Sequence, residues 1–524
     1  MTNCVHHFLE QSATQYPDKT AVVHAEERIS YAVLNQAADN LAVYLITNGI
    51  GKGDRIALLM ENSVDYVIAY YGSLKAGAVA APLNPGLKPD GLQYLLDDLE
   101  PAAIITTYKS ERLLNAVSLN DQAMRCLIIK APKKDWSGSA FRVSAFDEAI
   151  ADTSAGRSPD KINEITAQDL AGIIYTSGST GQPKGVMLTH GNITSNTLSI
   201  CNYLDLTGDD IQMVVLPFFY VMGKSLLNTH IAAGGTVVIN NRFLYPADVI
   251  KEMISEQVTG FSGVPATYAY LLHRSPLAKH RDELSALRYC SQAGGHMAAQ
   301  LKKDLRAVLP AHTNIVIMYG ATEASARLTY LPPDRFTDKM DSIGRAIAGV
   351  TLKLVDTSGK TAAQGQTGEL VAKGPNIMQG YWKAPDATKA AIDKDGFYHT
   401  GDLATMDEEG FFYLTGRKDN ILKVSGHKVN PREVEDCLMQ TQKLLEAMVF
   451  GVPDDLSGNR LVALCVPLKE EVTESELQQY CHETTPRHCV PSEFAFLKAL
   501  PKAGSGKVDP QQCRETYQRL QSKH

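Results

Sequence analysis

The sequence predicts an α/β protein: a large N-terminal domain of α/β layers with a β-rich subdomain, followed by a small α+β domain. The chain has 524 residues, too many for a single core, since cores stop growing at roughly 250 to 300 residues. It is 44% hydrophobic and 21% charged, which supplies enough apolar side chains for large buried cores. Short apolar runs alternate with helical segments until about Ala346, where the pattern changes.

The apolar runs predict strands buried on both faces, as in a mostly parallel sheet. They are rich in Val, Ile and Ala and occupy residues 55–60, 102–106, 213–217, 236–240 and 314–320. A longer apolar region, residues 66–83, is interrupted by glycine, lysine and proline, and falls short of the ~20 apolar residues that span a bilayer. We therefore expect a buried helix leading into a strand there, and no membrane span.

The last third of the chain has a different pattern. After Ala346, shorter alternating strands with turn signals indicate a β-rich subdomain. A charged turn at residues 416–420 then precedes the amphipathic stretch PREVEDCLMQ, and the remaining residues form an α+β tail. We place the domain boundary at Asp419, which divides the chain into residues 1–418 and 419–524.

Charge and cysteine usage exclude several classes of protein. The net charge of -7 provides no basic field that would attract nucleic acid. The 9 cysteines include no CxxC pair and no regular spacing, so they suggest neither a zinc site nor a disulfide framework. The N-terminus lacks the basic start and continuous apolar stretch of a secretory signal. A cytoplasmic location is expected.

The segment TSGSTGQPKG, residues 176–185, predicts a loop that binds a polyphosphate. It follows an apolar run and combines three glycines, four hydroxyl side chains and one lysine. Glycines let the backbone approach a ligand closely, and amides, hydroxyls and an ammonium are the groups that surround phosphate oxygens. A Walker A loop is excluded because Lys184 stands between Pro183 and Gly185. The candidate ligands are Thr176, Ser177, Gly178, Ser179, Thr180 and Lys184.

Five segments in this order resemble the adenylate-forming superfamily of acyl-CoA synthetases, luciferases and peptide-synthetase adenylation domains. They are TSGSTGQPKG, YGATE at residues 319–323, TGD at 400–402, GRKDNILKVSGHKVNPREVE at 416–435 and PKAGSGKVD at 501–509. The resemblance covers essentially the whole chain. It implies that the N-terminal domain binds the nucleotide and the acyl group, and that the C-terminal domain is mobile and catalytic.

The resemblance also implies roles for the YGATE segment. Tyr319 would stack on adenine, with Gly320 beside it, and Thr322 would contact phosphate. Glu323 would help hold Mg²⁺, a hard cation that suits a carboxylate together with ATP oxygens. Thr322 and Glu323 are therefore expected in the catalytic centre.

Four more residues complete the expected nucleotide site. Asp402 is similar to the family aspartate that accepts both ribose hydroxyls, and Arg417 to the arginine that reaches the nucleotide, as suits a planar donor. In the segment SQAGGHM, Gly294 and Gly295 lack side chains and would let adenine and the acyl group approach the backbone.

Lys507 matches the family lysine that serves adenylation. Negative charge builds between two anionic reactants in that step, and a fixed ammonium is worth more in the transition state than in the ground state. The family then rotates the C-terminal domain at a hinge two residues after the arginine, which is Asp419 here. Gly426 would line the approach of the thiol by giving backbone clearance.

The segment at residues 216–230 resembles the acyl pocket of the family, with Tyr220 at its aromatic position. Gly295 and Ala321 are expected to complete the pocket. Residues 216–230 contain no carboxylate that would pair the ammonium of an α-amino acid, and burying that charge unpaired is costly. A non-amino carboxylic acid is therefore predicted. Lys224 is expected at the surface, and the alternative is a cation near the pocket that meets a polar substrate.

The predicted function is ATP-dependent activation of a carboxylic acid as an acyl-AMP, followed by transfer to a thiol. The cofactors would be ATP, Mg²⁺ and either CoA or the phosphopantetheine of a carrier protein, which present the same thiol. The alternatives are a stand-alone amino-acid adenylation enzyme and a catalytically silent nucleotide-binding scaffold. The second is disfavoured because the charged residues of the segments are present, namely Lys184, Glu323, Asp402, Arg417 and Lys507.

Overall fold

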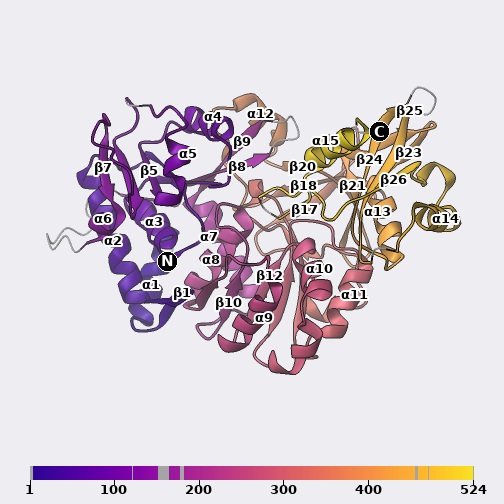
Figure 1. The fold of residues 1–524 in the computed structure, drawn as a ribbon, viewed down its shortest axis with the longest axis horizontal. Coiled ribbons are helices and arrows are strands. Elements are labelled where there is room, and N and C mark those ends of the chain that lie inside the picture. Colours follow the sequence, from indigo (N-terminus) through magenta and orange to yellow (C-terminus); the bar gives the residue numbers. More distant parts are fainter. Residues whose placement is uncertain are drawn as a thin grey trace.

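The computed structural model describes residues 4–120, 122–151, 164–177, 182–454, 458–469, 471–504 and 506–522. Its N-terminal part contains two large sheets (Figure 1). The first has eight strands in the order β19-β9-β8-β4-β3-β5-β6-β7. In that order they are Gly380–Tyr381, Pro183–Thr189, Leu170–Ser177, Val79–Leu83, Arg55–Leu59, Ala103–Thr107, Cys126–Lys130 and Arg142–Ala145. Pairing is parallel from β8 to β7, and antiparallel between β8 and β9 and between β9 and β19.

The second sheet has nine strands in the order β16-β15-β14-β13-β12-β10-β11-β1-β2. In that order they are Arg345–Ala346, Thr329–Tyr330, Asn314–Tyr319, Tyr289–Gln292, Gly260–Gly263, Ile211–Val214, Thr236–Ile239, Thr20–His24 and Glu27–Ser30. The central strands from β14 to β1 are parallel, and the edges are antiparallel. The predicted mostly parallel architecture is confirmed.

Helices form a layer between the two sheets. These helices are α1 (His6–Gln15), α2 (Tyr31–Thr47), α3 (Val64–Lys75), α7 (His190–Tyr203) and α8 (Val221–Ala233). Their apolar side chains join those of both sheets in one core, as Leu227 of α8 does with Leu58 of β3 and Val237 of β11. Burial of these side chains contributes about 25 cal/mol per Å² of apolar surface. The α3–β4 pair confirms the predicted helix leading into a strand.

Other helices cover the outer faces of the sheets. α4 (Pro89–Leu99) packs four leucines on the first sheet. The second sheet is covered by α9 (Pro246–Ser255), α10 (Pro265–Arg274) and α11 (Ala299–Val308). The remaining helices of this part are α5 (Glu111–Leu114), α6 (Phe146–Ile150) and α12 (Pro385–Ala391). None of the helices described is both long enough and apolar enough to cross a bilayer.

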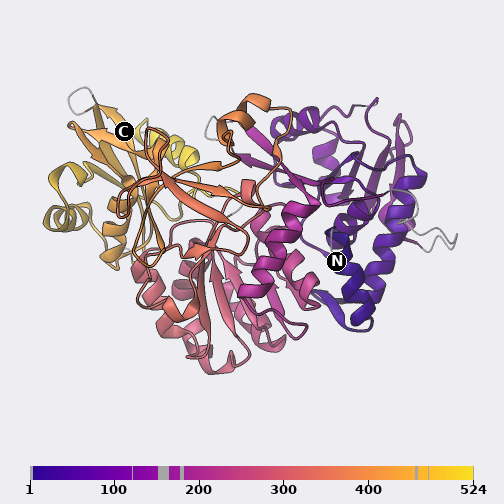
Figure 2. The same cartoon turned by 180° about the vertical axis from the view of Figure 1, so that it is seen from behind.

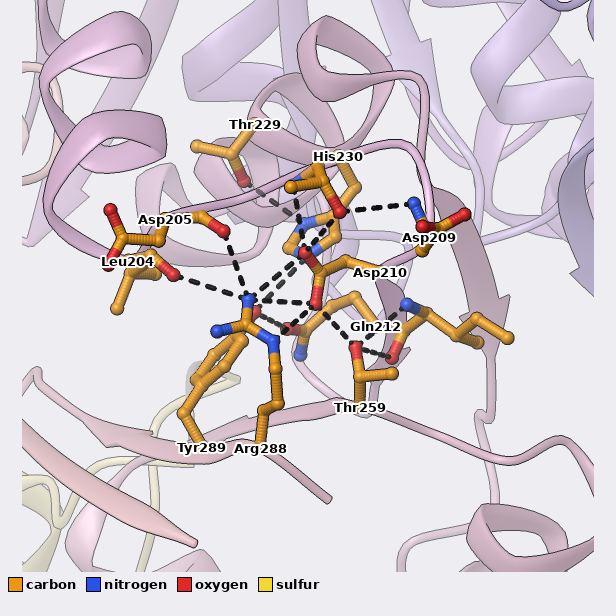
Figure 3. Close-up of polar contacts among 12 residues, drawn as sticks. Leu204, Asp205, Asp209, Asp210, Gln212, Thr229, His230, Thr259, Arg288 and Tyr289 are labelled. Carbon is orange, nitrogen blue, oxygen red and sulfur yellow. Dashed lines mark hydrogen bonds and ion pairs between the residues drawn. The ribbon is translucent and has the colours of Figure 1, made fainter. Parts of the chain in front are cut away.

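The second sheet contains an ion pair with a buried carboxylate near the start of β10 (Figure 3). Arg288 donates to both carboxylate oxygens of Asp210, at 2.8 and 3.0 Å. Asp210 also accepts from the hydroxyl of Thr259 at 2.7 Å and from the amide of Thr207 at 2.8 Å. The guanidinium of Arg288 also donates to the Leu204 carbonyl at 3.2 Å, so the pair ties α7 to the sheet. Its role is structural.

A four-stranded antiparallel sheet forms the predicted β-rich subdomain. Its order is β17-β18-β20-β21, with bounds Thr351–Val355, Gly368–Lys373, Tyr398–Met406 and Phe412–Arg417. The C-terminal part follows with a short hairpin, β22 (Leu422–Val424) and β23 (His427–Val429), and a sheet of β24 (Leu444–Asp454), β25 (Gly458–Pro467) and β26 (Glu493–Phe496).

Helices α13 (Pro431–Gln440), α14 (Glu474–Thr484) and α15 (Pro510–Gln521) complete the small α+β domain. α13 and α14 pack on one face of its sheet. On the other face, Phe450 and Val462 share a core with Tyr517 of α15 and with Tyr268 of α10. Figure 2 shows this domain beside the subdomain and the helices of the second sheet. The two parts of the chain are therefore docked.

Candidate active site

The predicted site residues gather where strands of the second sheet end. Parallel strands β13 and β14 place Gly294 and Tyr319 at the same edge, which is where open α/β sheets bind ligands. Gly320 comes next and must lack a side chain, because a Cβ there would lie 2.0 Å from the carbonyl oxygen of Ala326. Thr322 and Glu323 then form a 3-10 turn. The resemblance assigned these residues to the nucleotide and acyl site, and their roles there remain predictions.

Tyr319, Asp402 and Arg417 form one cluster. The hydroxyl of Tyr319 donates to Oδ2 of Asp402 at 2.5 Å, and a guanidinium nitrogen of Arg417 lies 3.4 Å from Oδ1. Strands β20 and β21 create this arrangement because they pair Asp402 with Arg417. Burial raises the pKa of Asp402, while Arg417 and the Tyr319 hydrogen bond act against it. The cluster offers a carboxylate and a cation to a polar ligand such as a ribose.

The predicted phosphate loop lies at the end of the β8–β9 hairpin. Thr176 pairs with Lys184 and Ser177 pairs with Pro183 across the hairpin. Gly178, Ser179 and Thr180 lie outside the described residues. The ammonium of Lys184 lies 5.4 Å from the centre of the Tyr381 ring, a distance at which a cation–π attraction operates.

Tyr381 links the phosphate loop to Glu323. Its hydroxyl donates to Oε1 of Glu323 at 2.8 Å, and its backbone pairs with Val186 in β9. The carbonyl of Glu323 accepts from the amide of Met378 at 2.7 Å, which holds the 3-10 turn in place. A carboxylate therefore faces the loop that carries Lys184.

Lys507 reaches this edge from the C-terminal domain. Its backbone closes a tight turn in which Ala503 donates to the Lys507 carbonyl at 2.8 Å. A Cβ on Gly504 would lie 2.6 Å from Nδ2 of Asn84 and 3.1 Å from the hydroxyl of Tyr220, so the turn rests on the N-terminal domain. A Cβ on Gly294 would lie only 3.0 Å from Cε of Lys507. Lys507 and Gly294, 213 positions apart, are therefore adjacent.

The environment of Lys507 is mixed in charge. Burial and the nearby Arg327 lower the pKa of the lysine, while Glu323 and Asp402 raise it, and the net direction is down. More than a third of the residue's surface remains exposed, even though protein surrounds it on several sides. Lys507 is therefore accessible to a ligand, and the charge of an anionic ligand would favour the ammonium.

A second contact holds the two domains together beside the site. His296, which follows Gly295, donates from Nε2 to Asp436 of α13 at 2.6 Å. The guanidinium of Arg432 in the same helix donates to Nδ1 of His296. The ammonium of Lys502 lies 4.4 Å from the ring centre of Tyr270 in α10. These contacts set the position of Lys507.

The predicted acyl-pocket residues are only partly brought together. Tyr220 precedes α8 and faces the turn that carries Lys507. A Cβ on Gly295 would lie 3.4 Å from Pro265 of α10, and Ala321 packs against the core between the sheets. These contacts place Tyr220, Gly295 and Ala321 against three different segments. The pocket therefore stays a prediction.

The expectation that Lys224 lies at the surface is wrong. Lys224 is only 4% exposed, because α8 lies in the layer between the two sheets. Its ammonium donates to the hydroxyl of Tyr66 and lies 3.7 Å from the ring centre of Tyr70. Burial lowers the pKa of Lys224 well below its usual range.

The predicted hinge and thiol-approach residues lie in the linking segment. Asp419 is exposed in a 3-10 turn, Lys418–Asn420, directly after β21. Gly426 lies in the turn between β22 and β23 with a φ of 84°, and open space surrounds the position of a Cβ. Both remain predictions, as does the boundary at Asp419.

Several residues of the site were not predicted from the sequence. Asn84, Tyr381 and the His296–Asp436 pair contact predicted residues, but they come from distant segments. His296 and Asp436 are 140 positions apart, so no local spacing relates them. For Arg432, its place inside the 416–435 segment was a usable signal.

Comparison with known proteins agrees with this geometry. The AMP-binding enzyme family model matches residues 9–382, and its C-terminal domain model matches residues 433–507. A long-chain-fatty-acid–CoA ligase of Bacillus subtilis is 31% identical over 522 residues, covering 95% of this chain and 92% of the relative. A 2-succinylbenzoate–CoA ligase of Bacillus cereus is 30% identical and covers 99% of this chain and 100% of the relative.

Solved structures of related enzymes have the same fold. ATP-bound MatB from Rhodopseudomonas palustris superposes with a TM-score of 0.84 at 28% identity, over 98% of this chain and 99% of that chain. The o-succinylbenzoate CoA synthetase of Bacillus subtilis, in complex with its acyl-adenylate intermediate, superposes with a TM-score of 0.79 at 26% identity. The match covers 96% of this chain and 97% of that chain. This chain belongs to the AMP-binding enzyme family and is of its acyl-CoA synthetase type.

Proposed function

We propose that this chain couples ATP cleavage to activation of a non-amino carboxylic acid, and then passes the acyl group to the thiol of CoA. The first step forms a bond between the acid's carboxylate and the α-phosphorus of ATP and releases pyrophosphate. The second step forms a thioester and releases AMP. The observation that carries the proposal is the position of Lys507 against Gly294, beside Asp402 and Glu323.

The nucleotide would lie along the strand ends of the second sheet. Asp402 would accept hydrogen bonds from the two ribose hydroxyls. Arg417 lies beside one of its oxygens and holds the carboxylate in place, and a carboxylate can accept at both oxygens. Tyr319 would lie against adenine, and its hydrogen bond to Asp402 would fix both side chains. Lys184, Thr176 and Thr322 would contact the phosphates, with the remaining predicted loop residues beside them.

Glu323 suits Mg²⁺, which takes oxygen ligands. One carboxylate oxygen of Glu323 accepts from the Tyr381 hydroxyl. The other oxygen could bind an ion that is also bound by phosphate oxygens of ATP. When bound, the ion would neutralise phosphate charge. Tyr381 would orient Glu323, so its hydroxyl acts on the position of the carboxylate.

Lys507 would act in the first step alone. An ammonium directed at the α-phosphate and the attacking carboxylate stabilises the charge that builds between two anions. The thiol needs the same space in the second step, so the domain of residues 419–524 would rotate away at Asp419 and bring Gly426 toward the acyl adenylate. The exposed turn at Lys418–Asn420 offers residues that can absorb such a rotation.

The acid is proposed to lack an α-ammonium. α8 supplies no carboxylate, and it carries the buried Lys224 one turn after Tyr220. The ammonium of an α-amino acid would be a second cation beside Lys224, and α8 has no carboxylate to pair it. CoA is favoured as the acceptor because the relatives are CoA ligases, whereas a phosphopantetheinyl carrier protein would present the same thiol.

An ATP–pyrophosphate exchange screen tests this proposal. Short, medium, long, aromatic and hydroxy acids would be compared with the twenty amino acids, and active acids would then be assayed for thioester formation with CoA and with carrier proteins. Exchange with non-amino acids, followed by CoA thioester, is expected. Exchange limited to amino acids would overturn the substrate assignment, and no AMP release with any acid would favour a silent scaffold.

A further inference from the structure

The first residues of the described chain bring one thiol and two imidazoles together, far from the nucleotide site. Sγ of Cys4 and a ring nitrogen from each of His6 and His7 all lie within 4.8 Å of one another. His6 and His7 begin helix α1, and Cys4 stands just before it. We propose that Cys4, His6 and His7 bind a zinc ion that fastens the start of α1 to the core.

Two of these side chains are buried, which is ordinary for a free cysteine but unusual for a histidine. Cys4 is 0% exposed and His6 is 2% exposed, while His7 is half-buried. Nδ1 of His6 is buried and has no hydrogen-bond partner. A buried polar atom without a partner costs about 1 to 3 kcal/mol, so such an atom calls for a ligand. A metal ion would satisfy it.

The other two donor atoms have only weak partners. The Cys4 thiol makes a long contact of 3.6 Å with the carbonyl of Ile165, and Nδ1 of His7 accepts from the Cys4 amide at 3.3 Å. A metal ion can replace the thiol contact, and the His7 ring has a second nitrogen, Nε2, that can bind an ion while Nδ1 keeps the Cys4 amide. The three donors are thus available together.

The chemistry of the donors agrees with this geometry. A neutral imidazole keeps a lone pair that can bind a metal ion, and a free thiol must lose its proton to become a ligand. Binding therefore breaks the S–H bond, forms a zinc–thiolate bond and releases one proton to solvent.

The donor set selects the metal. One thiolate with two imidazoles is a set that zinc takes in a tetrahedral site, with a fourth position for water. Zinc bonds of about 2.0 to 2.3 Å hold ligand atoms roughly 3.3 to 3.8 Å apart, so modest side-chain rotations close the site. Hard cations such as Mg²⁺ prefer oxygen ligands.

The surroundings give the ion a structural role. The amide of Val5, between the proposed ligands, donates to Nδ1 of His190 at the start of α7 at 3.1 Å. Ser12 in α1 donates to the Ile231 carbonyl of α8 at 2.6 Å. An ion at Cys4 would therefore fix the end of the chain against α7 in the layer between the sheets.

Cobalt(II) titration of metal-free, tag-free protein tests the proposal. We expect one equivalent to bind with a thiolate charge-transfer band in the near ultraviolet and the visible bands of a tetrahedral ion. Cys4→Ser should lose the charge-transfer band. His7→Ala should weaken cobalt binding at least about 100-fold, because loss of a residue that only hydrogen-bonds to a metal ligand already weakens binding by about 10- to 100-fold. Cys126→Ser, at an equally buried cysteine, is the control and should bind normally.

Zinc-dependent melting gives a second readout. Zinc at a concentration a few times the wild-type Kd should raise the Tm of the wild type and of Cys126→Ser, and leave that of His7→Ala almost unchanged. Because His7 is less buried than Cys4, this variant keeps the test valid if Cys4→Ser fails to fold. A wild type without the charge-transfer band, or a band that persists in Cys4→Ser, would overturn the proposal.

Discussion

The side chain of Lys507 lies directly against Gly294, with a Cβ position on the glycine only 3.0 Å from Cε of the lysine. Gly294 has a φ of 85°, a value that disfavours any side chain. The contact joins the two domains of the chain at the edge of the second sheet. It also explains why the site needs a glycine at this position.

Gly294→Ala is expected to slow adenylation. The new methyl group would meet the end of a flexible side chain, so the lysine would give way rather than the backbone, and a displacement of about 1 Å can cost on the order of 100-fold in rate. Gly410→Ala is the control, since Gly410 has a φ of 81° with nothing within 4 Å. Pyrophosphate exchange measures both. Equal exchange rates in the two variants would contradict the contact.

The alkaline limb of the pH profile should depend on Lys507. The lysine must be protonated to act, and its lowered pKa means that activity is present below this pKa and falls as the pH rises through it. In the pH profile of kcat/KM for exchange, the pKa of the alkaline limb should therefore lie below 10.5, the ordinary pKa of lysine. Lys507→Arg should move the fall to higher pH, because arginine keeps its charge. An unchanged limb would exclude Lys507 as its source.

Asp419→Pro is expected to separate the two half-reactions. Proline holds φ near −65°, which opposes rotation at the exposed turn Lys418–Asn420. Because the domains are docked with Lys507 at the site, adenylation should persist while thioester formation from preformed acyl adenylate is lost. Asp419→Ala should retain both. If proline reduced the two steps equally, the hinge would lie elsewhere.

Asp210→Asn should destabilise the fold without touching the site. The change removes the charge that faces Arg288 and is expected to cost roughly 2 to 3 kcal/mol, less than for a fully buried pair, because Arg288 is partly exposed. Asp209→Asn, at the exposed neighbour, serves as the control. Urea unfolding measures both changes. Similar unfolding midpoints for the two variants would show that the Asp210–Arg288 pair adds little to the free energy of unfolding.

The same pair has a predictable pH dependence. Burial acts to raise the pKa of Asp210, but hydrogen bonds from Thr207, Thr259 and Arg288 and the charge of Arg288 lower it overall. Its contribution is therefore present above the unfolded pKa of about 3.9 and lost as the pH falls through the folded value. The stability gap between wild type and Asp210→Asn should shrink below about pH 4.

Much of the fold could be predicted because strands buried on both faces have continuous apolar sequences. Residues 55–60 and 314–320 match β3 and β14 to within a residue, and the stretch PREVEDCLMQ is helix α13. The segments that resemble the family also assigned Tyr319, Asp402 and Arg417 to one nucleotide site, whereas their contacts with one another are seen only in the structure.

What the sequence could not predict depends on tertiary packing. Lys224 looked like a surface lysine because a single charge in a helix reveals nothing about the second sheet that covers it. The His296–Asp436 contact joins residues that only the docking of two domains brings together. Cys4, His6 and His7 are close in sequence, but spacing alone gave no reason to expect their burial.

The central claim is that Lys507 supplies the charge for acyl-adenylate formation and is dispensable for thioester formation. The decisive measurement compares Lys507→Ala with wild type in ATP–pyrophosphate exchange and in thioester formation from preformed acyl adenylate. We expect exchange to fall by at least about 100-fold, as when one charge-stabilising donor is removed, while thioester formation stays near wild type. Near-normal exchange in a folded Lys507→Ala protein would contradict the claim.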